Sequence, residues 1–394
     1  MYGSTSKLFI NEENFIKWAI EPQPRSTPSF ETFINRAKVR TGNGSVLSLN
    51  DYMKGKKITV DVLRAIYNFI INKKEYLQRF YNTSMKVADL HFGGDVAAAS
   101  AGAIEPPMKL RELDNNKKSK YKNVIRNMHY DHILEKTKSG IKGLPSYFTV
   151  LNELLTQFII DYKILTPSSG FYICNGRMGS VLSSLYFRSS IMNPYMVYSL
   201  NKSYLHAKRV FTPTLGWTSY MYGFLESGVE EYIGTDVIPS VCNKTRKFGE
   251  TFYPDKTIEI YCKPSEDLLN INAFSRKYRA YFDTVFFSPP YYDMETYSGD
   301  KQSVRKYPTY ELWLEKYWKK TIELCKYVLG PGGKMVYIIS DYGEYNLIKD
   351  LNQITSSIGF RLIKKEKMYN KNVHVTDHRE TGEFIFIFSA AAGG

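Results

Sequence analysis

The chain has 394 residues, 43% hydrophobic and 23% charged, so it can bury a substantial core and is expected to form two domains or one with a large extension. Its formal net charge of +14 favours a polyanionic partner, nucleic acid before a membrane surface. Four scattered cysteines without a Cys-x-x-Cys pair argue against a disulfide framework and a zinc site. No apolar run approaches the ~18 residues of a membrane span and no signal-peptide start is present, so we expect an intracellular, cytoplasmic protein with no membrane partner.

The first part of the chain, residues 1–150, is predicted to be a mainly helical, basic region that recognises the substrate. The stretch 61–82 places Leu63, Ile66 and Ile70 at helical spacing and carries Lys and Arg on its other faces. These residues therefore predict amphipathic helices with a basic surface.

The sequence changes in character at Phe92, where small residues, a Pro-Pro pair and a charge run predict a flexible loop or linker. A second helical pattern follows at 147–165. Residues 151–201 are predicted to be connecting helices.

From Lys202 onward, strand-like and helix-like segments alternate. This pattern predicts an α/β fold with a mostly parallel sheet covered on both faces and closed by a C-terminal antiparallel hairpin. Ligands of such sheets bind at the carboxyl ends of the strands. The strands are expected at 207–212, 230–237, 256–262, 281–287 and 334–340, the hairpin at 360–369 and 382–389, and helices at 219–228 and 309–329.

Two of the expected strands end in residues suited to a nucleoside. The loop after the first strand contains Pro213, Thr214, Gly216 and Trp217, and the second strand ends at Asp236. A glycine-containing turn, a helix and an acidic residue roughly 20 positions later are typical of nucleoside binding, because the carboxylate can accept from two ribose hydroxyls. An Asp at a strand end is also a common turn former or helix cap, so this pair alone leaves both interpretations open.

The third and fourth strands end in two further candidate loops. Ser265 and Glu266 follow the third strand, where an adenine edge would lie, although Ser-Glu-Asp is also a good helix start. The fourth strand runs into "FFSPPYYD" (286–293), whose two prolines remove two backbone donors and cannot continue a central strand. The segment is either a strand end or a rigid loop that holds a hydroxyl, fixed carbonyls and an aromatic ring at the mouth of a site.

The order of these loops resembles that of class I S-adenosylmethionine-dependent methyltransferases. "SPPY" resembles the catalytic loop of the DNA amino-methyltransferases, which reads Asp, Asn or Ser, then Pro-Pro and an aromatic residue, with Ser typical of cytosine-N4 enzymes. The resemblance covers about 202–389 and implies a catalytic domain there, S-adenosylmethionine as cofactor, no metal, and methylation of the exocyclic amine of cytosine or adenine in DNA. It implies cofactor-binding roles for Thr212, Pro213, Thr214, Gly216, Trp217, Asp236, Ser265 and Glu266, and catalytic roles for Ser288, Pro289, Pro290 and Tyr291.

The chemistry of an exocyclic amine explains the residue types of this loop. The amine is a poor nucleophile because its lone pair is delocalised into the ring, and acceptors at Ser288 Oγ and the Pro289 carbonyl would favour a pyramidal nitrogen. Tyr291 offers a face to an extruded base, a stack that contributes on the order of 1–3 kcal/mol, and Tyr292 is a further expected substrate contact. No strong general base is required, because the leaving group is neutral and alignment can supply most of the rate.

The first loop departs from the family. Thr212 stands where an acidic residue usually ends the first strand, and Thr218 follows Trp217 where a second glycine is common. Thr212 cannot form a salt bridge with the cofactor's amino group, and Thr218 is expected to narrow the approach to the methionine moiety. A catalytically silent nucleic-acid-binding or assembly subunit therefore remains an alternative.

Double-stranded DNA is the expected partner, and target recognition is placed before Lys202 because no second domain fits among the later loops. Lys117, Lys118, Lys120 and Lys122 are predicted to contact phosphates. RNA or a protein glutamine remain alternative substrates, because related Asn-Pro-Pro-Tyr loops act on them. The Asn-, Lys-, Ile- and Tyr-rich composition indicates an AT-rich genome, such as that of a phage or large DNA virus, with the protein then in the host cytoplasm or virion.

Three minor motifs are predicted to be structural. "CNGRMGS" (174–180) is an ordinary surface turn or a turn that contacts a base or the nucleic-acid backbone, and "NPYMVYS" (193–199) is a helix start. Two histidine pairs lack a third ligand, so they are expected at the surface and without a metal. These pairs are His129 with His132 and His374 with His378.

Overall fold

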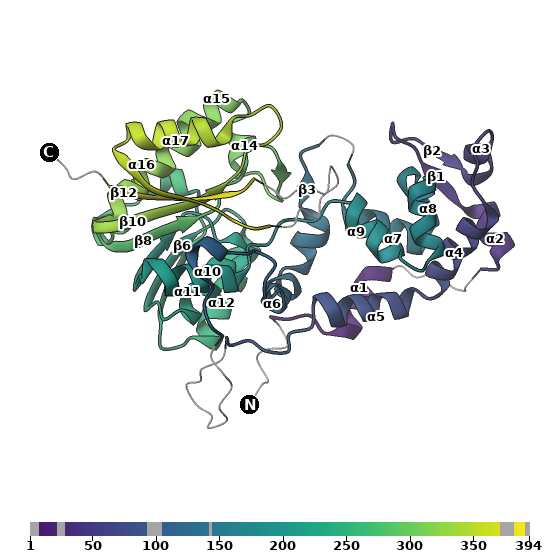
Figure 1. The fold of residues 1–394 in the computed structure, drawn as a ribbon, viewed down its shortest axis with the longest axis horizontal. Coiled ribbons are helices and arrows are strands. Elements are labelled where there is room, and N and C mark those ends of the chain that lie inside the picture. The colour runs from purple at the N-terminus through teal and green to yellow at the C-terminus, as the bar shows by residue number, and fades with distance from the viewer. Residues whose placement is uncertain (1–7, 22–27, 93–104, 142–143, 371–381, 391–394) are drawn as a thin grey trace, which may run out of the picture.

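The computed structural model describes residues 8–21, 28–92, 105–141, 144–370 and 382–390. Figure 1 shows two lobes, one built around a β-sheet and the other mainly helical. Within the described ranges, no helix is long and apolar enough to cross a membrane.

The sheet lobe is organised by seven strands in the order β11-β12-β10-β8-β5-β6-β7. Every neighbouring pair is parallel except the two pairs that include β12, which runs antiparallel to both β10 and β11. The strands are β5 (Arg209–Thr212), β6 (Glu231–Thr235), β7 (Thr257–Tyr261), β8 (Phe282–Phe287), β10 (Leu329–Ile339), β11 (Phe360–Lys367) and β12 (Phe384–Ala390).

This strand order, with its single reversed strand, is that of the class I methyltransferase sheet, and the predicted α/β fold and closing hairpin are confirmed. The glycine-rich stretch 330–333, which precedes the predicted fifth strand, lies inside β10, where the pairing with β8 shifts register between Leu329 and Lys334. A bulge accommodates the extra residues without ending the strand.

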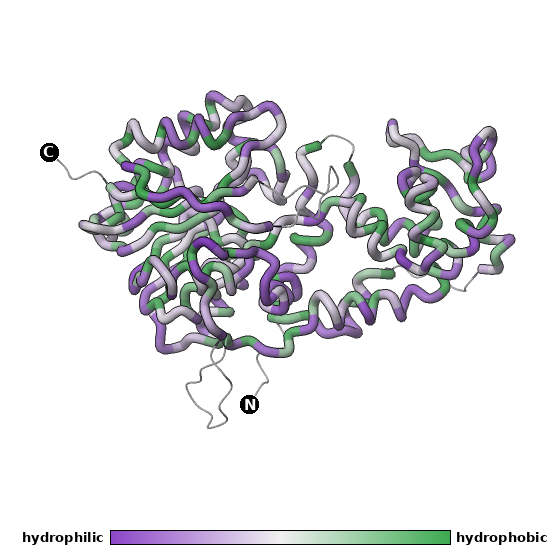
Figure 2. The backbone as a smooth tube through the Cα atoms, in the orientation of Figure 1, coloured by the Kyte–Doolittle hydropathy of each residue, from purple (hydrophilic) through white to green (hydrophobic). Residues whose placement is uncertain are grey.

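The strands form because their residues suit a sheet that is buried on both faces. In β8, five of the six side chains in Phe282–Phe287 are buried, and such continuous apolar runs are typical of parallel strands between two helical layers. Figure 1 shows α16 (Lys319–Val328) and α17 (Leu347–Ser357) on one side of the sheet, and α11 (Ser219–Glu226) and α12 (Pro239–Phe252) on the other. Figure 2 shows green hydrophobic stretches along the central strands.

Other helices complete the sheet lobe. Helix α10 begins at Pro194, capped by Asn193, and packs on α11, so the predicted helix start is confirmed. The remaining helices are α6 (Lys120–Met128), α10 (Pro194–Leu200), α13 (Asn272–Lys277), α14 (Ser303–Lys306) and α15 (Tyr310–Trp313), and the short strands β3 (Lys138–Ser139) and β9 (Glu295–Thr296) pair with each other.

The N-terminal lobe comprises residues 11–21, 28–84 and 144–187, and the segment before residue 85 packs against the segment after residue 143. Strand β1 pairs in parallel with β4, which joins the two segments, and α1 packs on both α5 and α7. The domain boundary predicted at residue 150 falls inside α7. The elements are α1 (Glu12–Ile20), α2 (Phe30–Arg36), β1 (Lys38–Arg40), β2 (Val46–Ser48), α3 (Leu49–Met53), α4 (Val60–Ile71), α5 (Lys73–Ser84), α7 (Tyr147–Gln157), β4 (Ile159–Asp161), α8 (Pro167–Cys174) and α9 (Met178–Leu185).

The flexible loop or linker predicted after Phe92 is described from residue 105, and residues 105–119 form a loop without α-helix or strand that packs against the sheet lobe. Met108 and Leu113 are buried in the core, and Asn115 donates its backbone N–H to the Tyr369 carbonyl at 2.8 Å. The segment packs because its few apolar residues are buried against the sheet lobe, an outcome that its Pro-Pro pair and lysines do not reveal. By contrast, the predicted helical spacing in α4 is confirmed, since Leu63, Ile66 and Ile70 are buried.

Candidate functional site

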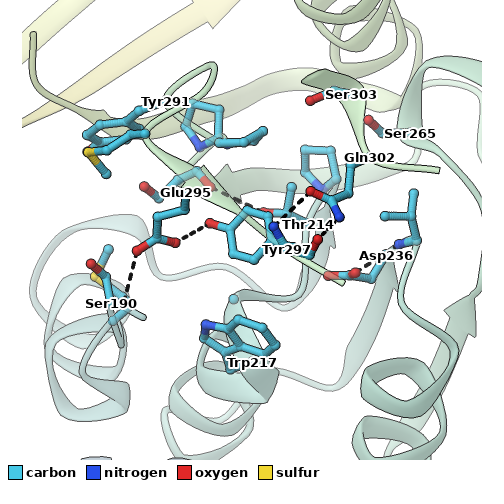
Figure 3. Close-up of a pocket in the computed structure, with 18 of the residues that line it drawn as sticks. Ser190, Thr214, Trp217, Asp236, Ser265, Tyr291, Glu295, Tyr297, Gln302 and Ser303 are labelled. Carbon is cyan, nitrogen blue, oxygen red and sulfur yellow. Dashed lines mark hydrogen bonds between the residues drawn. The ribbon is translucent and has the colours of Figure 1, made fainter. Parts of the chain in front are cut away.

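A large pocket opens at the carboxyl ends of the parallel strands. Strand β5 continues into β6 on one side and is flanked by β8 on the other, so the chain reverses its winding direction between β5 and β8. Ligands of open α/β sheets bind at such a switch point. The pocket has an empty volume of about 1300 Å³, including its open mouth, and the loops after β5, β6, β7 and β8 all contribute to its lining. Figure 3 shows Trp217 and Asp236 on one side of the pocket and Tyr291 on the other.

The loop after β5 lines the pocket through four of the predicted residues, Pro213, Thr214, Gly216 and Trp217. Gly216 has φ +51°, and a Cβ at this position would lie 2.3 Å from the ring of Tyr220. Glycine is therefore required here both by the left-handed backbone and by close packing.

Tyr220 is a pocket residue that the sequence analysis did not single out, and it connects two loops. Its ring packs under Gly216, and its hydroxyl accepts the backbone N–H of Ser288 at 3.2 Å. Burial raises the pKa of the Tyr220 hydroxyl to about 12, so the group stays protonated. Thr214 Oγ1 donates to the Ser288 carbonyl at 3.4 Å, which adds a second connection between the loops after β5 and β8.

Asp236 follows β6 and lies in the pocket lining as predicted. Its Oδ1 accepts the N–H groups of Val237 and Ile238 at 2.8 and 3.1 Å, and its Oδ2 accepts that of Leu215 at 3.3 Å. The carboxylate thus also fastens the loop after β5. Burial raises the pKa of this carboxyl, and the three backbone N–H groups oppose that shift because they favour the charged form.

Ser265 and Glu266 follow β7, and both line the pocket. Ser265 Oγ shares a hydrogen bond with Thr321 Oγ1 at 3.0 Å, whereas Glu266 forms an ion pair of 3.2 Å with Lys306. Burial raises the pKa of the Glu266 carboxyl. Both side chains therefore lie where the sequence analysis expected them, each with a protein partner.

The "SPPY" segment follows β8, and all four of its residues line the pocket. Ser288 Oγ donates to the Ile338 carbonyl at 3.1 Å, so its lone pairs remain for an incoming donor. Among the described residues, no hydrogen bond ends on the Pro289 carbonyl. Tyr291 is 6% exposed and donates its hydroxyl to Glu383 Oε1 at 3.1 Å, so its ring is held in place at the pocket wall.

Tyr292 also lies in the pocket lining, but most of its ring packs within the protein. Its hydroxyl donates to the Pro308 carbonyl at 2.6 Å, and its ring contacts Tyr310 and Tyr345. Tyr292 is one of the few non-glycine residues with a positive φ, +54°. Its backbone therefore redirects the chain after the prolines.

Two expectations for the first loop are corrected by the structure. Thr212 does not line the pocket: it is fully buried, and its Oγ1 lies 2.5 Å from the hydroxyl of Tyr232 inside the lobe. Thr218 does not narrow the pocket either, because it is fully buried and its Oγ1 lies 2.9 Å from His129 Nε2. Both threonines point into the protein because their hydroxyls have hydrogen-bond partners there, Tyr232 for Thr212 and His129 for Thr218.

Several pocket residues were not predicted from the sequence. Glu295 is buried, accepts the Tyr297 hydroxyl and the Ser190 N–H, and has a pKa raised by burial (Figure 3). Gln302 holds the backbone of Tyr297 with both atoms of its amide group. A motif search could not find these residues because they follow the proline loop in no familiar spacing. The same holds for Met294, Lys301, Ser303, Val304, Tyr317, Met368, Asn370 and Glu383, whereas Asn115, Ile191, Met192 and Lys263 precede the proline loop and belong to no motif that points to a pocket.

The four predicted phosphate-contacting lysines lie at the start of α6, and not all are free to meet a partner. Lys118 pairs with Glu105 at 3.0 Å, and Lys120 pairs with Asp89 at 3.1 Å. Burial lowers the pKa of Lys122 to about 7, with a contribution from Arg126. Lys117 is exposed. The DNA role of this run stays a prediction, and three of its members carry less available charge than the sequence suggests.

The expectation of surface histidines is wrong for His129 and His132, which are 0% and 3% exposed. Thr218 of the loop after β5 contacts His129, and Ser240 and Ser298, from two separate segments, contact His132. His374 and His378 lie outside the described residues. Within the part of the chain that the structure describes, no group of three His, Cys, Asp or Glu side chains could hold a metal ion.

No family model matches this chain, and no curated protein matches it in sequence. Among solved structures, a protein of Pyrococcus horikoshii named as a candidate RNA methyltransferase is 13% identical, over 50% of this chain and 83% of its own, with a TM-score of 0.34. A TehB-like SAM-dependent methyltransferase from Corynebacterium glutamicum is 13% identical, over 46% of this chain and 80% of its own, with a TM-score of 0.29. The [4+2]-cyclase SpnF is 10% identical, over 47% of this chain and 75% of its own, with a TM-score of 0.33.

These similarities are too low to carry an argument, so the fold assignment rests on the strand order and the site on its geometry. The chain has a class I methyltransferase fold, and the loops at the carboxyl ends of its parallel strands converge on one pocket.

Proposed function

We propose that the protein is an S-adenosylmethionine-dependent methyltransferase that modifies an exocyclic amine of a DNA base. The observation that carries the proposal is the convergence, in one pocket, of the Asp236 carboxylate and the Ser288-Pro289 acceptors across the switch point of the sheet. A carboxylate suited to a ribose hydroxyl and a rigid acceptor pair suited to an amine are the two recognition elements that this reaction needs.

The residues on the Asp236 side fit the cofactor. Backbone N–H groups fill three of the roughly four acceptor sites of the Asp236 carboxylate, two on Oδ1 and one on Oδ2, so the remaining lone pair of Oδ2 can accept from a ribose hydroxyl. Trp217 offers an apolar wall, and Ser265 and Glu266 offer polar atoms beyond it. When bound, S-adenosylmethionine would supply an electrophilic methyl group on its sulfonium.

The residues on the Ser288 side fit the amine. Because Ser288 Oγ donates to Ile338 and not toward the pocket, it can act as an acceptor for one proton of the amine. The Pro289 carbonyl can accept the other, and the prolines keep both acceptors from moving. Tyr291 presents a ring fixed by Glu383, on which an extruded base can stack. Together these groups would aim the nitrogen lone pair, and alignment supplies much of the rate in such a transfer.

The N-terminal lobe supplies a surface suited to DNA. On α8, Phe171 and Tyr172 are 67% and 43% exposed, and Arg177 is exposed in the following turn. Arg79 of α5 shares a cavity with Cys174 and Gly176 of that turn, so the two elements form one surface. We call Phe171, Tyr172, Arg177 and Arg79 the α8 surface.

The α8 surface is also electrostatically available. None of the ion pairs found among the described residues includes Arg79 or Arg177. Unpaired guanidinium groups can contact phosphates, and exposed aromatic rings can stack on bases. This supports placing part of the DNA contact before Lys202, at the turn that contains "CNGRMGS".

A silent nucleic-acid-binding subunit is the second candidate, favoured by one observation. The loop after β5 has non-glycine residues at positive φ where the family usually has glycine, and Thr212 gives the cofactor no charge. A protein with this loop but no cofactor affinity would retain the fold and the α8 surface.

The deciding experiment combines binding and product analysis. Calorimetry with S-adenosylmethionine and S-adenosylhomocysteine tests the cofactor site, and mass spectrometry of nucleosides from DNA co-expressed with the protein tests the reaction. Methylated cytosine or adenine in DNA would support the proposal and name the base. Cofactor binding with methylated RNA or protein would change the substrate, and a lack of cofactor binding would favour the silent subunit.

A further inference from the structure

The backbone of the loop after β5 is unusual over three consecutive residues. Gly216, Trp217 and Thr218 have φ values of +51°, +58° and +74°. Glycine adopts this left-handed region freely, whereas a β-branched residue such as threonine almost never does. Something outside the loop must therefore hold Thr218 in this conformation.

The side chain of Thr218 is held from two other elements. It is fully buried, and its Oγ1 lies 2.9 Å from Nε2 of His129 and 2.7 Å from Oγ1 of Thr245. His129 follows the last residue of α6, and Thr245 belongs to α12. The hydrogen bond to His129 connects the loop to a segment 89 residues earlier in the chain.

The chemistry of His129 makes it the donor of this pair. Burial lowers the pKa of His129 well below its usual value, and Lys244 and His132 lower it further, so the ring is neutral. Its Nδ1 is buried and has no hydrogen-bond partner among the described residues. A buried N–H without a partner is rarer than a buried acceptor without one, so we assign the proton to Nε2. His129 then donates to Thr218, which in turn can donate to Thr245.

The conformation of Thr218 matters because Trp217 precedes it in the chain. Trp217 lines the pocket, where its ring lies 5.8 Å from those of both His132 and Tyr297. If Thr218 relaxed to right-handed backbone angles, the direction of the chain at Trp217 would change and the indole would leave the wall.

We propose that His129 is a positioning residue for the cofactor pocket: through Thr218 it holds residues 216–218 in the left-handed conformation and so keeps Trp217 in the pocket wall. The hydrogen bond from His129 stabilises the left-handed backbone at Thr218, a conformation that a glycine at this position would adopt without a partner. This role rests on the proposed function only in that the ligand is S-adenosylmethionine. It also gives the segment that follows α6 a direct contact with the cofactor loop.

The first test removes the hydrogen bond from either side. His129→Ala and Thr218→Val should each weaken the binding of S-adenosylhomocysteine about tenfold in calorimetry, as expected for the loss of one buried hydrogen bond. His129→Gln, whose side-chain amide keeps a donor, should recover part of the affinity. The double variant H129A/T218V should bind no more weakly than either single variant, because both remove the same contact.

The second test is a rescue that a packing role would not produce. Glycine adopts the left-handed region without a partner, so H129A/T218G should bind within about threefold of the wild type, whereas H129A/T218V should not. Thermal unfolding of all variants is measured in parallel, because H129A also leaves a cavity and is expected to lower Tm whether or not glycine is present at 218.

The outcomes separate this proposal from the proposed function. If H129A lowers Tm but leaves affinity unchanged, or if H129A/T218G binds no better than H129A, His129 only fills space and the proposal is wrong. If the wild type binds neither ligand, the proposed function fails. In that case a double-mutant cycle on Tm, from the variants H129A, T218V and H129A/T218V, tests the contact without a ligand. Additive effects on Tm would show that His129 does not hold Thr218.

Discussion

The two lobes present their polar residues in opposite ways. In the sheet lobe, Asp236, Glu295 and Ser288 turn inward to one pocket, each with hydrogen-bond partners that hold it in place. In the N-terminal lobe, Arg79 and Arg177 are exposed beside aromatic side chains. A parallel sheet gathers polar groups where its strands end, whereas a helical lobe offers a broad surface. The methylation rate should therefore depend on single atoms in the sheet lobe, whereas DNA affinity should depend on the summed charge of the N-terminal lobe.

The largest expected effect comes from Ser288→Ala. Loss of the Oγ acceptor should lower the methylation rate about 100-fold, comparable to the loss of one preorganised polar group in an active site. Affinity for S-adenosylmethionine should stay within about twofold of the wild type, because the hydroxyl faces the amine. Ser356→Ala, an exposed serine of α17, is the matched control and should be neutral in both assays. An equal loss of rate in both variants would remove Ser288 from the reaction.

Asp236→Asn should have the next largest effect, on cofactor affinity. Replacing a charged acceptor of ribose hydroxyls costs about 1.5–3 kcal/mol, which is roughly 10- to 100-fold in Kd. The asparagine keeps one oxygen, which can accept either from Val237 and Ile238 or from Leu215, so part of the hydrogen bonding at this carboxylate is lost as well. Calorimetry should show the loss while affinity for DNA is unchanged. Asp267→Asn, which removes a half-exposed carboxylate paired with Lys306, serves as control, and identical affinities for both variants and the wild type would exclude Asp236 from the site.

The contrast between free and paired cations predicts a smaller effect on DNA. The double variant R79E/R177E should weaken DNA binding about tenfold at low salt and reduce the salt slope by about 2, one unit for each lost phosphate contact. The matched double variant K118E/K120E breaks the ion pairs with Glu105 and Asp89 and should lower Tm with little change in the salt slope. The reverse outcome would place the DNA path over α6, as the sequence alone suggests. Affinity for S-adenosylmethionine, measured in parallel, shows whether each variant is folded.

The smallest expected effect is on the pH dependence of stability. Burial raises the pKa of Glu295 above its value in the unfolded chain, so its stabilising contribution is complete at low pH and declines as the pH rises through the folded-state pKa. Glu295→Gln has no such charge and can keep both hydrogen bonds. The difference between the Tm of the variant and that of the wild type should therefore rise by about 1–2 °C from pH 5 to pH 8. A constant difference across that range would show that the carboxylate is fully compensated in the folded state.

Most of the sheet lobe could be predicted from patterns in the sequence. Alternating strand and helix patterns located all seven strands of the sheet, and parallel strands place their carboxyl ends on the same edge, so Gly216, Asp236, Ser265 and Ser288 had to converge. Local features such as the double proline and the glycine turn carry that information within a few residues.

The tertiary structure alone decided which side chains are covered. His129 and Thr218, 89 positions apart, are buried by each other, and Glu295 is desolvated by the distant Ser190 segment. In the sequence Lys118 and Lys120 read as unpaired charges, whereas in the folded chain both form ion pairs with Glu105. Burial and pairing of this kind depend on contacts between segments far apart in the chain, and single-sequence patterns record spacing only along the chain. For that reason the pocket loops could be predicted, whereas the residues that hold those loops in place could not.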